Sequence, residues 1–359
     1  MVTNRPYIII GNWKMHKTIE EARKFVKNLL SSFQPAESTI IGLAVPYTVI
    51  HPVAEEAKGT ALMVGAQNMN DASEGAFTGE IAGYMLKDAG AQFVLLGHSE
   101  RRHLYGETDE FINRKVKRAV EVELRPILCI GETKEEYKAK ETHSVIERQL
   151  TEGLKDIQPP KLQQLIIAYE PVWAIGNGQC ATPEIAQEAH HFCRQILAKI
   201  LTEALAQQIV IQYGGSVNSS NAHELLAQPD IDGLLIGRAS LSLESFLQIV
   251  NDKFQKINRK VKAMTFLYFF TIALFMILCV LLCAVILMQE SKSSGLGASF
   301  GGEASESLFG TSTADVLKRF TAWLALIFLI SCILLSLWTA ALGRSKTTAP
   351  AFTMEHIES

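Results

Sequence analysis

Glu170 stands where an apolar run ends, and this position could give its carboxylate a chemical role. The run 165–169 precedes it, Pro171 follows it, and a short apolar segment then leads to Gly176 and Gly178. A carboxylate at the carboxyl end of a strand could act as a base, and a segment that pivots on the proline and glycines could close over it. A glutamate before a loop is more often an ordinary surface residue, so this interpretation depends on the residues that end the other apolar runs.

Other apolar runs also end in polar or glycine-rich groups. These groups are Asn12 and Lys14 after the first run, His98 and Glu100 after the fourth, Gly214, Gly215 and Ser216 after the seventh, and Gly237 and Arg238 after the eighth. Each is weak evidence alone, because a lysine there is usually a solvated cap and a histidine is more often structural. If the fold brings all these ends to one face, a carboxylate, an imidazole, an ammonium and two phosphate-binding glycine turns converge. That combination indicates acid–base chemistry on a phosphorylated substrate.

The elements that would position these groups are short apolar runs that alternate with amphipathic segments. The apolar runs are 7–10, 39–45, 61–67, 92–97, 126–130, 165–169, 209–213 and 233–236. Segments 18–33 and 183–205 are expected to be helices, the second with Thr182 as its cap and Pro183 in its first turn. Eight strands alternating with helices over ~250 residues are typical of a parallel (β/α)8 barrel. A doubly wound open sheet is the alternative, but no glycine-rich nucleotide motif follows the first run.

Two long stretches near the end of the chain carry no charged residue, 264–288 and 320–342. Each is long enough to cross a hydrocarbon core of ~30 Å as a helix, whereas a buried soluble helix would normally keep a polar face. The sequence therefore predicts an α/β fold, a (β/α)8 barrel followed by two transmembrane helices.

Charge and cysteine content argue against several functional classes. The formal net charge of −3 gives no basic footprint for nucleic acid. The six cysteines form no Cys-x-x-Cys pair and no zinc-like cluster with histidine, so we expect no metal site. This cysteine usage suits a reducing compartment.

Five motifs resemble those of the triosephosphate isomerase family. The motifs are Gly11-Asn12-Trp13-Lys14, then 75–80, 97–102, 169–176 and 213–217. The resemblance covers about residues 5–255 and all eight expected strands. It implies a TIM barrel that interconverts dihydroxyacetone phosphate and D-glyceraldehyde 3-phosphate through an enediolate, with no metal or organic cofactor.

The resemblance also implies a catalytic role for five residues, and these roles are general to the family. Glu170 would remove a proton from the carbon next to the carbonyl. His98, kept neutral at the start of a helix, would polarise the carbonyl oxygen. Lys14 would stabilise the enediolate and Asn12 would orient it. Glu100 would position Lys14 or shuttle protons.

Substrate binding is expected from backbone groups at glycine-rich turns. The resemblance implies that the amides of Gly176, Ser216 and Gly237 hold the phosphate, beside Gly215 and Arg238. The family normally has two adjacent glycines after the eighth strand, and here the second position is Arg238. We expect its side chain to point to solvent; a weakened phosphate site is the alternative.

Two further features of the barrel are implied by the resemblance. The segment around Trp173 would be a lid that excludes water, because an exposed enediol phosphate would lose its phosphate. The loop 67–80 would interdigitate with a second copy in a homodimer, with Thr78 reaching Asn12 and His98 of the partner subunit. Docking would also cover the apolar loop tip at Phe77.

The loop between the two apolar stretches carries motifs of its own. It contains Gly-Ala-Ser-Phe-Gly at 297–301 and Leu-Phe-Gly at 308–310. With the flanking helices, it resembles the preprotein translocase subunit SecG over about residues 264–345. This part carries no catalytic residue. The resemblance implies that it lies in membrane lipid beside the channel-forming subunits of the Sec translocase.

The expected organisation is a fusion of two functional parts. We predict an isomerase barrel at 1–255, a basic linker at 256–263, a SecG-like membrane domain at 264–345 and a disordered tail at 346–359. One alternative is a membrane-anchored isomerase whose tail has no export role. Another is a catalytically dead barrel, although the joint presence of Asn12, Lys14, His98 and Glu170 argues against it.

The two parts imply opposite membrane topologies. Five basic residues precede the first apolar stretch, namely Lys253, Lys256, Arg259, Lys260 and Lys262. By the positive-inside rule they place the barrel in the cytoplasm, where its substrates are, whereas SecG would place the connector there. We expect an inner-membrane protein with two spans and a cytoplasmic barrel. A tail made or released separately near Met264 would instead leave a free cytoplasmic barrel.

Overall fold

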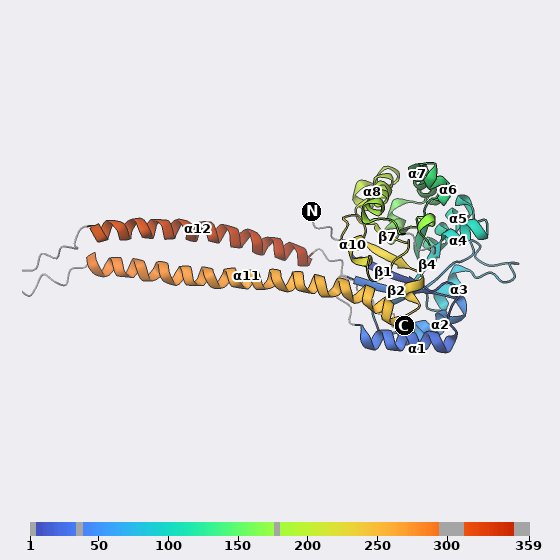
Figure 1. Ribbon diagram of the computed structural model, residues 1–359, viewed down its shortest axis with the longest axis horizontal. Helices are drawn as coiled ribbons and strands as arrows, with labels where there is room; N and C mark the ends of the chain where they lie inside the picture. The colour runs from blue at the N-terminus through green and yellow to red at the C-terminus, as the bar shows by residue number, and fades with distance from the viewer. Residues whose placement is uncertain (1–4, 34–38, 176–179, 294–311, 348–359) are drawn as a thin grey trace, which may run out of the picture. The chain divides into compact units, whose positions relative to one another are not determined.

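The computed structural model describes residues 5–33, 39–175, 180–293 and 312–347. A closed barrel of eight parallel strands lies in its first compact unit, Met1–Lys256 (Figure 1). The strands are β1 (Tyr7–Asn12), β2 (Thr39–Val45), β3 (Leu62–Ala66), β4 (Phe93–Leu96), β5 (Arg125–Ile130), β6 (Ile166–Tyr169), β7 (Val210–Tyr213) and β8 (Gly233–Ile236). Each strand pairs with the next, and β8 closes on β1 with Gly233 opposite Ile8. The predicted barrel is confirmed, and the open sheet is excluded.

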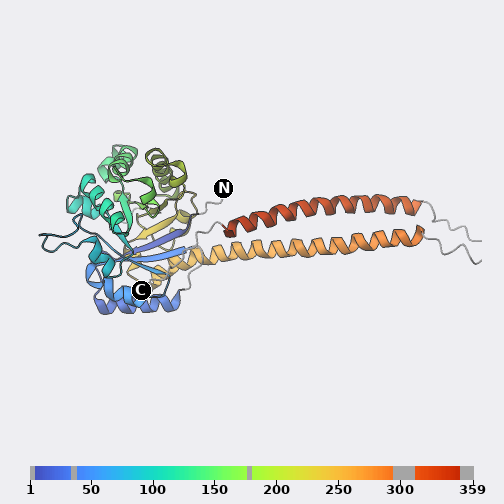
Figure 2. The ribbon, with the colours of Figure 1, turned by 180° about the vertical axis from the view of Figure 1, so that it is seen from behind.

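Helices surround the strands, as the two opposite views show (Figures 1 and 2). The α-helices of this layer are α1 (Ile19–Ser32), α2 (Ile50–Ala57), α3 (Gly83–Asp88), α4 (Ser99–Leu104), α5 (Asp109–Glu121), α6 (Lys134–Lys138), α7 (Thr142–Gly153), α8 (Pro183–Ile200), α9 (Glu203–Ala206) and α10 (Ala222–Leu226). Short 3-10 helices are η1 (Tyr47–Val49), η2 (Pro159–Leu162), η3 (Val172–Ala174) and η4 (Arg238–Ser240).

Strand side chains alternate between two apolar layers, as the period of a strand requires. Ile8, Ile10 and Phe93 belong to the cluster inside the barrel, whereas Ile9 and Leu43 belong to the larger cluster between strands and helices. Because both layers are apolar, the strands read in the sequence as continuous apolar runs.

The expectation of one helix over 183–205 is wrong. Helix α8 ends at Ile200, because Leu201 leaves the helical region with φ −117° and ψ −113°. Thr202 then caps α9, and its side chain accepts a hydrogen bond from the N–H of Leu205. A capping threonine inside an apolar pattern is the signal that marks this break.

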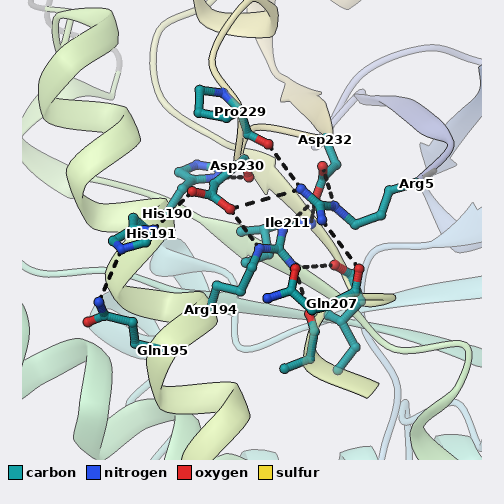
Figure 3. Close-up of polar contacts among 12 residues, drawn as sticks. Arg5, His190, His191, Arg194, Gln195, Gln207, Ile211, Pro229, Asp230 and Asp232 are labelled. Carbon is teal, nitrogen blue, oxygen red and sulfur yellow. Dashed lines mark hydrogen bonds and ion pairs between the residues drawn. The ribbon is translucent and has the colours of Figure 1, made fainter. Parts of the chain in front are cut away.

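A buried charge network lies at the amino-terminal end of the barrel (Figure 3). Arg194 on α8 donates from Nε to Oδ1 of Asp230 at 2.8 Å and from Nη2 to Oδ2 of Asp232 at 2.7 Å. Arg5 donates to the other oxygen of Asp232 at 2.7 Å. Asp232 also accepts a hydrogen bond from the N–H of Ile211 at 3.1 Å. The network therefore ties α8 to residues at or next to the starts of β1, β7 and β8.

The second compact unit, Ile257–Ser359, contains two long apolar helices. They are α11 (Leu243–Ser293), which begins in the barrel unit, and α12 (Ser312–Thr347). Their candidate membrane spans are Leu267–Leu287 and Lys318–Ala340, in agreement with the two predicted helices. The linker expected at 256–263 is helical and lies inside α11. Of the tail expected to be disordered, residues 346 and 347 are helical and residues 348–359 lie outside the described residues.

Within the second unit, aromatic and polar side chains join the two helices. Phe275 stacks on Phe328 with ring centroids 5.3 Å apart. The hydroxyl of Tyr268 lies 3.0 Å from that of Thr339, and its ring meets Trp338 edge-on at 5.8 Å. Such aromatic and hydroxyl contacts are suited to helix pairs in a membrane.

Candidate active site

Glu170 follows β6 directly and is buried, with 2% of its surface exposed. Its Oε2 accepts a hydrogen bond from the N–H of Ser99 at 3.0 Å, and its Oε1 lies 3.2 Å from Nε2 of His98. A Cβ at Gly214 would stand 2.8 Å from Cγ of Glu170, so the glycine after β7 leaves room for this side chain. The carboxylate is thus held between two strand ends and close to an imidazole.

His98 caps the start of α4 and is also buried. Its Nδ1 accepts a hydrogen bond from the N–H of Glu100 at 3.2 Å, so this nitrogen carries no proton. A neutral ring then carries its proton on Nε2, the atom that faces Glu170. Hydrogen bonding therefore selects the tautomer that can donate from Nε2 toward the centre of the site.

Lys14 is held with its backbone at a positive φ of 53°. Its N–H donates to Oδ1 of Asn12 at 3.0 Å, and its carbonyl accepts a hydrogen bond from the side-chain amide of Gln67 at 2.9 Å. Its ammonium reaches Oε1 of Glu100 at 2.5 Å. A strained conformation of this kind persists only where the surroundings fix it, and two side-chain contacts do so here.

The five residues predicted to be catalytic come together at the carboxyl ends of three strands. Asn12 ends β1 and Lys14 follows it, His98 and Glu100 follow β4, and Glu170 follows β6. A cavity of about 260 Å³ opens beside them, and Tyr47, Gln67, Asn68 and Arg101 are among its other lining residues. Asn12, Lys14, His98 and Glu100 line this cavity, whereas Glu170 does not line it and contacts it only through His98.

The expected phosphate-binding residues are only partly described. Gly237 precedes η4, and a Cβ there would meet no atom closer than Cε of Lys14 at 3.7 Å. The N–H of Ser216 donates to the carbonyl of Ala174 at 2.9 Å. Gly215 lies over Tyr213, whose hydroxyl would be 2.2 Å from an added Cβ.

The two remaining substrate-binding candidates differ in what the structure shows of them. The side chain of Arg238 is exposed in η4. Gly176 lies outside the described residues, as does Asn177 in the same segment.

The segment before Gly176 makes a contact that the sequence did not indicate. Glu132 follows β5 and is fully buried. It accepts hydrogen bonds from Nε1 of Trp173 at 2.7 Å and from the hydroxyl of Tyr169 at 3.1 Å. Burial raises the pKa of Glu132, although these two hydrogen bonds oppose the shift. Glu132 follows an apolar run, as Glu170 does, so the same sequence pattern could have identified Glu132 as a candidate.

The loop between β3 and α3 extends from the barrel (Figure 1). Its base is closed by Asn70, which donates to Glu80 at 2.9 Å and to the carbonyl of Ile81 at 2.9 Å. Thr78 is exposed, and half of the Phe77 surface is exposed. Thr78 is therefore not brought to the active site of its own chain.

Across the described residues, no group of three or more His, Cys, Asp or Glu side chains could hold a metal ion. The groups gathered at the strand ends are a carboxylate, an imidazole and an ammonium. These are sufficient for proton transfer next to a carbonyl.

A parallel barrel with such groups at its carboxyl end has the architecture of an enzyme that moves protons on a small polar substrate. The family model described as "Triosephosphate isomerase" matches residues 7–253. The chain belongs to the triosephosphate isomerase family.

Individual relatives agree with this assignment over nearly their whole length. The chain is 61% identical over 260 residues to the triosephosphate isomerase of Protochlamydia amoebophila, which covers 72% of this chain and 98% of the relative. It is 48% identical over 246 residues to that of Carboxydothermus hydrogenoformans, covering 68% of this chain and 98% of the relative. The barrel is therefore an enzyme of the isomerase class that its motifs predicted.

A second family model matches the membrane part. The model described as "Preprotein translocase SecG subunit" matches residues 268–356, which include the second candidate span, the connector and all of the first span except Leu267. The predicted resemblance of this part to SecG is confirmed, and it indicates association with a membrane and with a translocase.

Proposed function

We propose that Glu170, His98, Lys14, Asn12 and Glu100 carry out the interconversion of dihydroxyacetone phosphate and D-glyceraldehyde 3-phosphate. The observation that supports this most strongly is the distance of 3.2 Å between the Glu170 carboxylate and Nε2 of His98. A base and a hydrogen-bond donor at this spacing can act on a carbon and on the carbonyl oxygen next to it.

The proton balance of the proposed reaction is complete without a cofactor. The Glu170 carboxylate takes a proton from the carbon next to the carbonyl, and negative charge develops on the carbonyl oxygen. Nε2–H of His98 and the ammonium of Lys14 stabilise that oxygen, while Asn12 orients it. The carbonyl oxygen takes the proton of Nε2–H of His98, and the hydroxyl on the neighbouring carbon gives its own proton to that nitrogen. The protonated Glu170 then returns its proton to the neighbouring carbon, whose oxygen has become the new carbonyl. Glu100 fixes the position of the Lys14 ammonium, which it contacts at 2.5 Å.

Substrate entry requires the carboxylate to turn. In the present arrangement Oε2 of Glu170 accepts the Ser99 N–H, so this oxygen is directed away from the cavity. A rotation that gives up this hydrogen bond would bring the carboxylate over the substrate carbon. Closure of the segment after Pro171 would accompany the rotation and exclude water from the enediolate.

The phosphate is proposed to bind the backbone amides of Gly176, Ser216 and Gly237, next to Gly215 and Arg238. The open space at Gly237 beside Lys14 supports this assignment. The Ser216 amide now donates to Ala174, so phosphate binding and movement of the lid base would be coupled through this one donor.

Replacing Arg238 by glycine is expected to change KM by less than about twofold. The side chain of Arg238 is exposed, and the proposed contact with the phosphate is made by the backbone before it. The variant should keep the salt dependence of the parent in steady-state kinetics at low and high ionic strength. A clear rise in KM, together with a stronger salt dependence in the parent, would show that the guanidinium holds the phosphate.

A homodimer is proposed to complete the site. Several apolar side chains near the cavity and the protruding loop are exposed, among them Met15 at 93%, Phe77 at 51% and Tyr105 at 68%. Exposed apolar groups of this size are usually covered by a partner. We propose that the loop of a second copy covers these apolar side chains and directs its Thr78 at the active site.

Residues 1–258 alone are expected to form a soluble, active dimer. Every strand and every proposed catalytic group precedes the first candidate membrane span at Leu267. Turnover of glyceraldehyde 3-phosphate and the mass from light scattering check this expectation. An active monomer would contradict the dimer, and a folded but inactive dimer would contradict the proposed chemistry.

The membrane part is proposed to act as an accessory subunit of the Sec protein-export channel. The supporting observation is that the match to SecG spans both helices and the connector, whereas a simple anchor needs one helix. A membrane-anchored isomerase with no export role is the alternative. Recovery of channel subunits with the detergent-solubilised chain would favour the export role, and their absence would favour the anchor.

The barrel is proposed to lie in the cytoplasm, with the membrane domain in an inner membrane. The supporting observations are the five basic residues before the first span and the location of the substrates. A chain made or cleaved separately near Met264 would release a free cytoplasmic barrel together with an ordinary membrane subunit.

A cysteine introduced into the connector, S305C, is expected to react with a membrane-impermeant thiol reagent in intact cells. In the proposed topology this connector faces outward, whereas K256C, before the first span, should be protected. The chain without either substitution gives the background from its natural cysteines. Protection of S305C in a full-length, membrane-bound chain would rule out the proposed topology.

A further inference from the structure

Lys17 lies between the two loops that carry the ammonium and the proposed phosphate-binding backbone. It belongs to the loop from β1 to α1, three residues after Lys14, and its side chain crosses to the loop that follows β8. Its ammonium donates to the carbonyl of Leu241 at 3.0 Å, directly after η4. The contact joins residues 224 positions apart in the sequence.

The surroundings of Lys17 hold its ammonium in place. The nitrogen lies 4.7 Å from the ring centroid of Phe25 and 5.2 Å from that of Trp13, and the two rings meet edge-on. Phe25 also packs against Phe246 on α11. A cation over aromatic faces is attracted to them, and partial burial strengthens the attraction. Burial lowers the pKa of Lys17, against the opposing effect of Glu21.

The backbone of Lys17 is constrained as well. Its φ is 79°, in the left-handed region that a lysine adopts only at a cost. The next residue, Thr18, begins α1 with a capping box, in which its side chain and that of Glu21 exchange hydrogen bonds with each other's backbone N–H. The chain therefore enters α1 at a fixed angle, and Lys17 is held on the side facing η4.

The same two loops also approach each other at the substrate side. A Cβ at Gly237 would lie 3.7 Å from Cε of Lys14, so the ammonium that would stabilise the enediolate stands beside the proposed phosphate turn. Lys17 joins these loops a few residues further along each of them. The spacing between carbonyl-binding and phosphate-binding groups thus depends on a contact that touches no substrate.

We infer that Lys17 is a positioning residue for the isomerase reaction, which sets the distance between Lys14 and the phosphate-binding turn at Gly237. This inference rests on the proposed function of the site and deepens it. Loss of the ammonium would free the turn from the first loop and weaken phosphate binding before any chemistry occurs. Affinity for the phosphate group should therefore fall more than kcat.

Three substitutions in the full-length chain, solubilised in detergent, test the inference. K17M keeps most of the aliphatic stem but removes the charge and the donor. K17G also removes them and suits the positive φ, so it preserves the backbone if K17M fails to fold. K17R keeps both a cation and a donor. Lys140, an exposed lysine with φ 62°, supplies the matched controls K140M and K140G.

Inorganic phosphate is the probe, because it reports on the turn without the carbonyl chemistry. K17M and K17G should raise its inhibition constant and the KM for glyceraldehyde 3-phosphate by about tenfold, comparable to the loss of one charge-assisted hydrogen bond. K17R should remain within about threefold of the parent, and both Lys140 variants should match the parent. A purely structural role would lower Tm without changing these constants.

Unchanged phosphate inhibition and KM in both K17M and K17G would overturn the inference. Phosphate affinity is also measured from the rise in Tm that added phosphate causes, which does not require turnover. A parent chain that binds phosphate but has no activity would contradict the proposed function alone. An active parent whose Lys17 variants bind phosphate equally well would contradict the positioning role alone.

Discussion

Replacing Glu170 by aspartate is expected to lower kcat about a hundredfold and to leave the fold intact. Removing one methylene withdraws the carboxylate by about 1 Å, and a displacement of that size in a reacting group can cost ~10²-fold in rate. The shorter side chain also cannot keep its present contacts with both Ser99 and His98. Initial rates in both directions, with Tm as the check on folding, measure the effect.

The control for this substitution is Glu147, an exposed glutamate on α7. E147D makes the same chemical change far from the strand ends and should keep the parent kcat. If E170D also kept it, Glu170 would not be the base. H98Q gives an independent check, because an amide can donate and accept hydrogen bonds but, unlike an imidazole, cannot transfer a proton to the substrate oxygen. Parent-like turnover in H98Q would contradict the proposed polarisation of the carbonyl.

Replacing Arg194 by methionine is expected to destabilise the barrel strongly without changing its chemistry. Arg194 is buried between Asp230 and Asp232 and also donates to the carbonyls of Ala206 and Ile209. Removing one partner of a buried ion pair typically costs ~3–5 kcal/mol. In R194M the carboxylates of Asp230 and Asp232 would keep only Arg5 as an arginine counter-charge. For a domain of this size the loss corresponds to a fall in Tm on the order of 10 °C.

Thermal inactivation of R194M and of a matched surface variant checks this second expectation. R148M removes an arginine whose side chain is 54% exposed and whose Nε lies 3.3 Å from Oδ2 of Asp109. Exposed pairs contribute ~0–1 kcal/mol, so its Tm should stay close to that of the parent. Below the transition both variants should keep the parent kcat. A loss of kcat in R194M below its Tm would show that the network also supports the catalytic end.

Residues that follow a strand were predictable, because an apolar run that ends in a charged group is visible in the sequence. Glu170, His98 and Lys14 were found in this way, and the parallel topology then places them together. The two apolar helices were equally visible, since an uncharged stretch long enough to cross a bilayer is typical of a transmembrane helix.

Contacts between distant residues were not predictable from pattern alone. Arg5 and Asp232 are separated by 227 positions, and neither lies in a motif. Gln67 ends the third apolar run, but nothing in its type shows that it holds the carbonyl of Lys14. These positions depend on how strands and loops meet in the closed barrel, which a single sequence does not display.

The break between α8 and α9 was missed for a different reason. The apolar spacing continues across it, so the helical period alone favours one element. The side chain of Thr202 accepts a hydrogen bond from the N–H of Leu205, which ends the regular helical hydrogen bonding of α8 and begins α9. A search for capping residues inside long periodic stretches would have found the break.

The central claim is that one chain joins a working isomerase to a membrane domain. Its most direct test is the turnover of glyceraldehyde 3-phosphate by washed membranes from cells that make the full-length chain, with immunoblots against both parts. The account predicts that activity sediments with a full-length chain carrying both epitopes, and that membranes with E170D lose about a hundredfold of it. A full-length chain that sediments but is inactive, with activity confined to the soluble fraction, would contradict the claim.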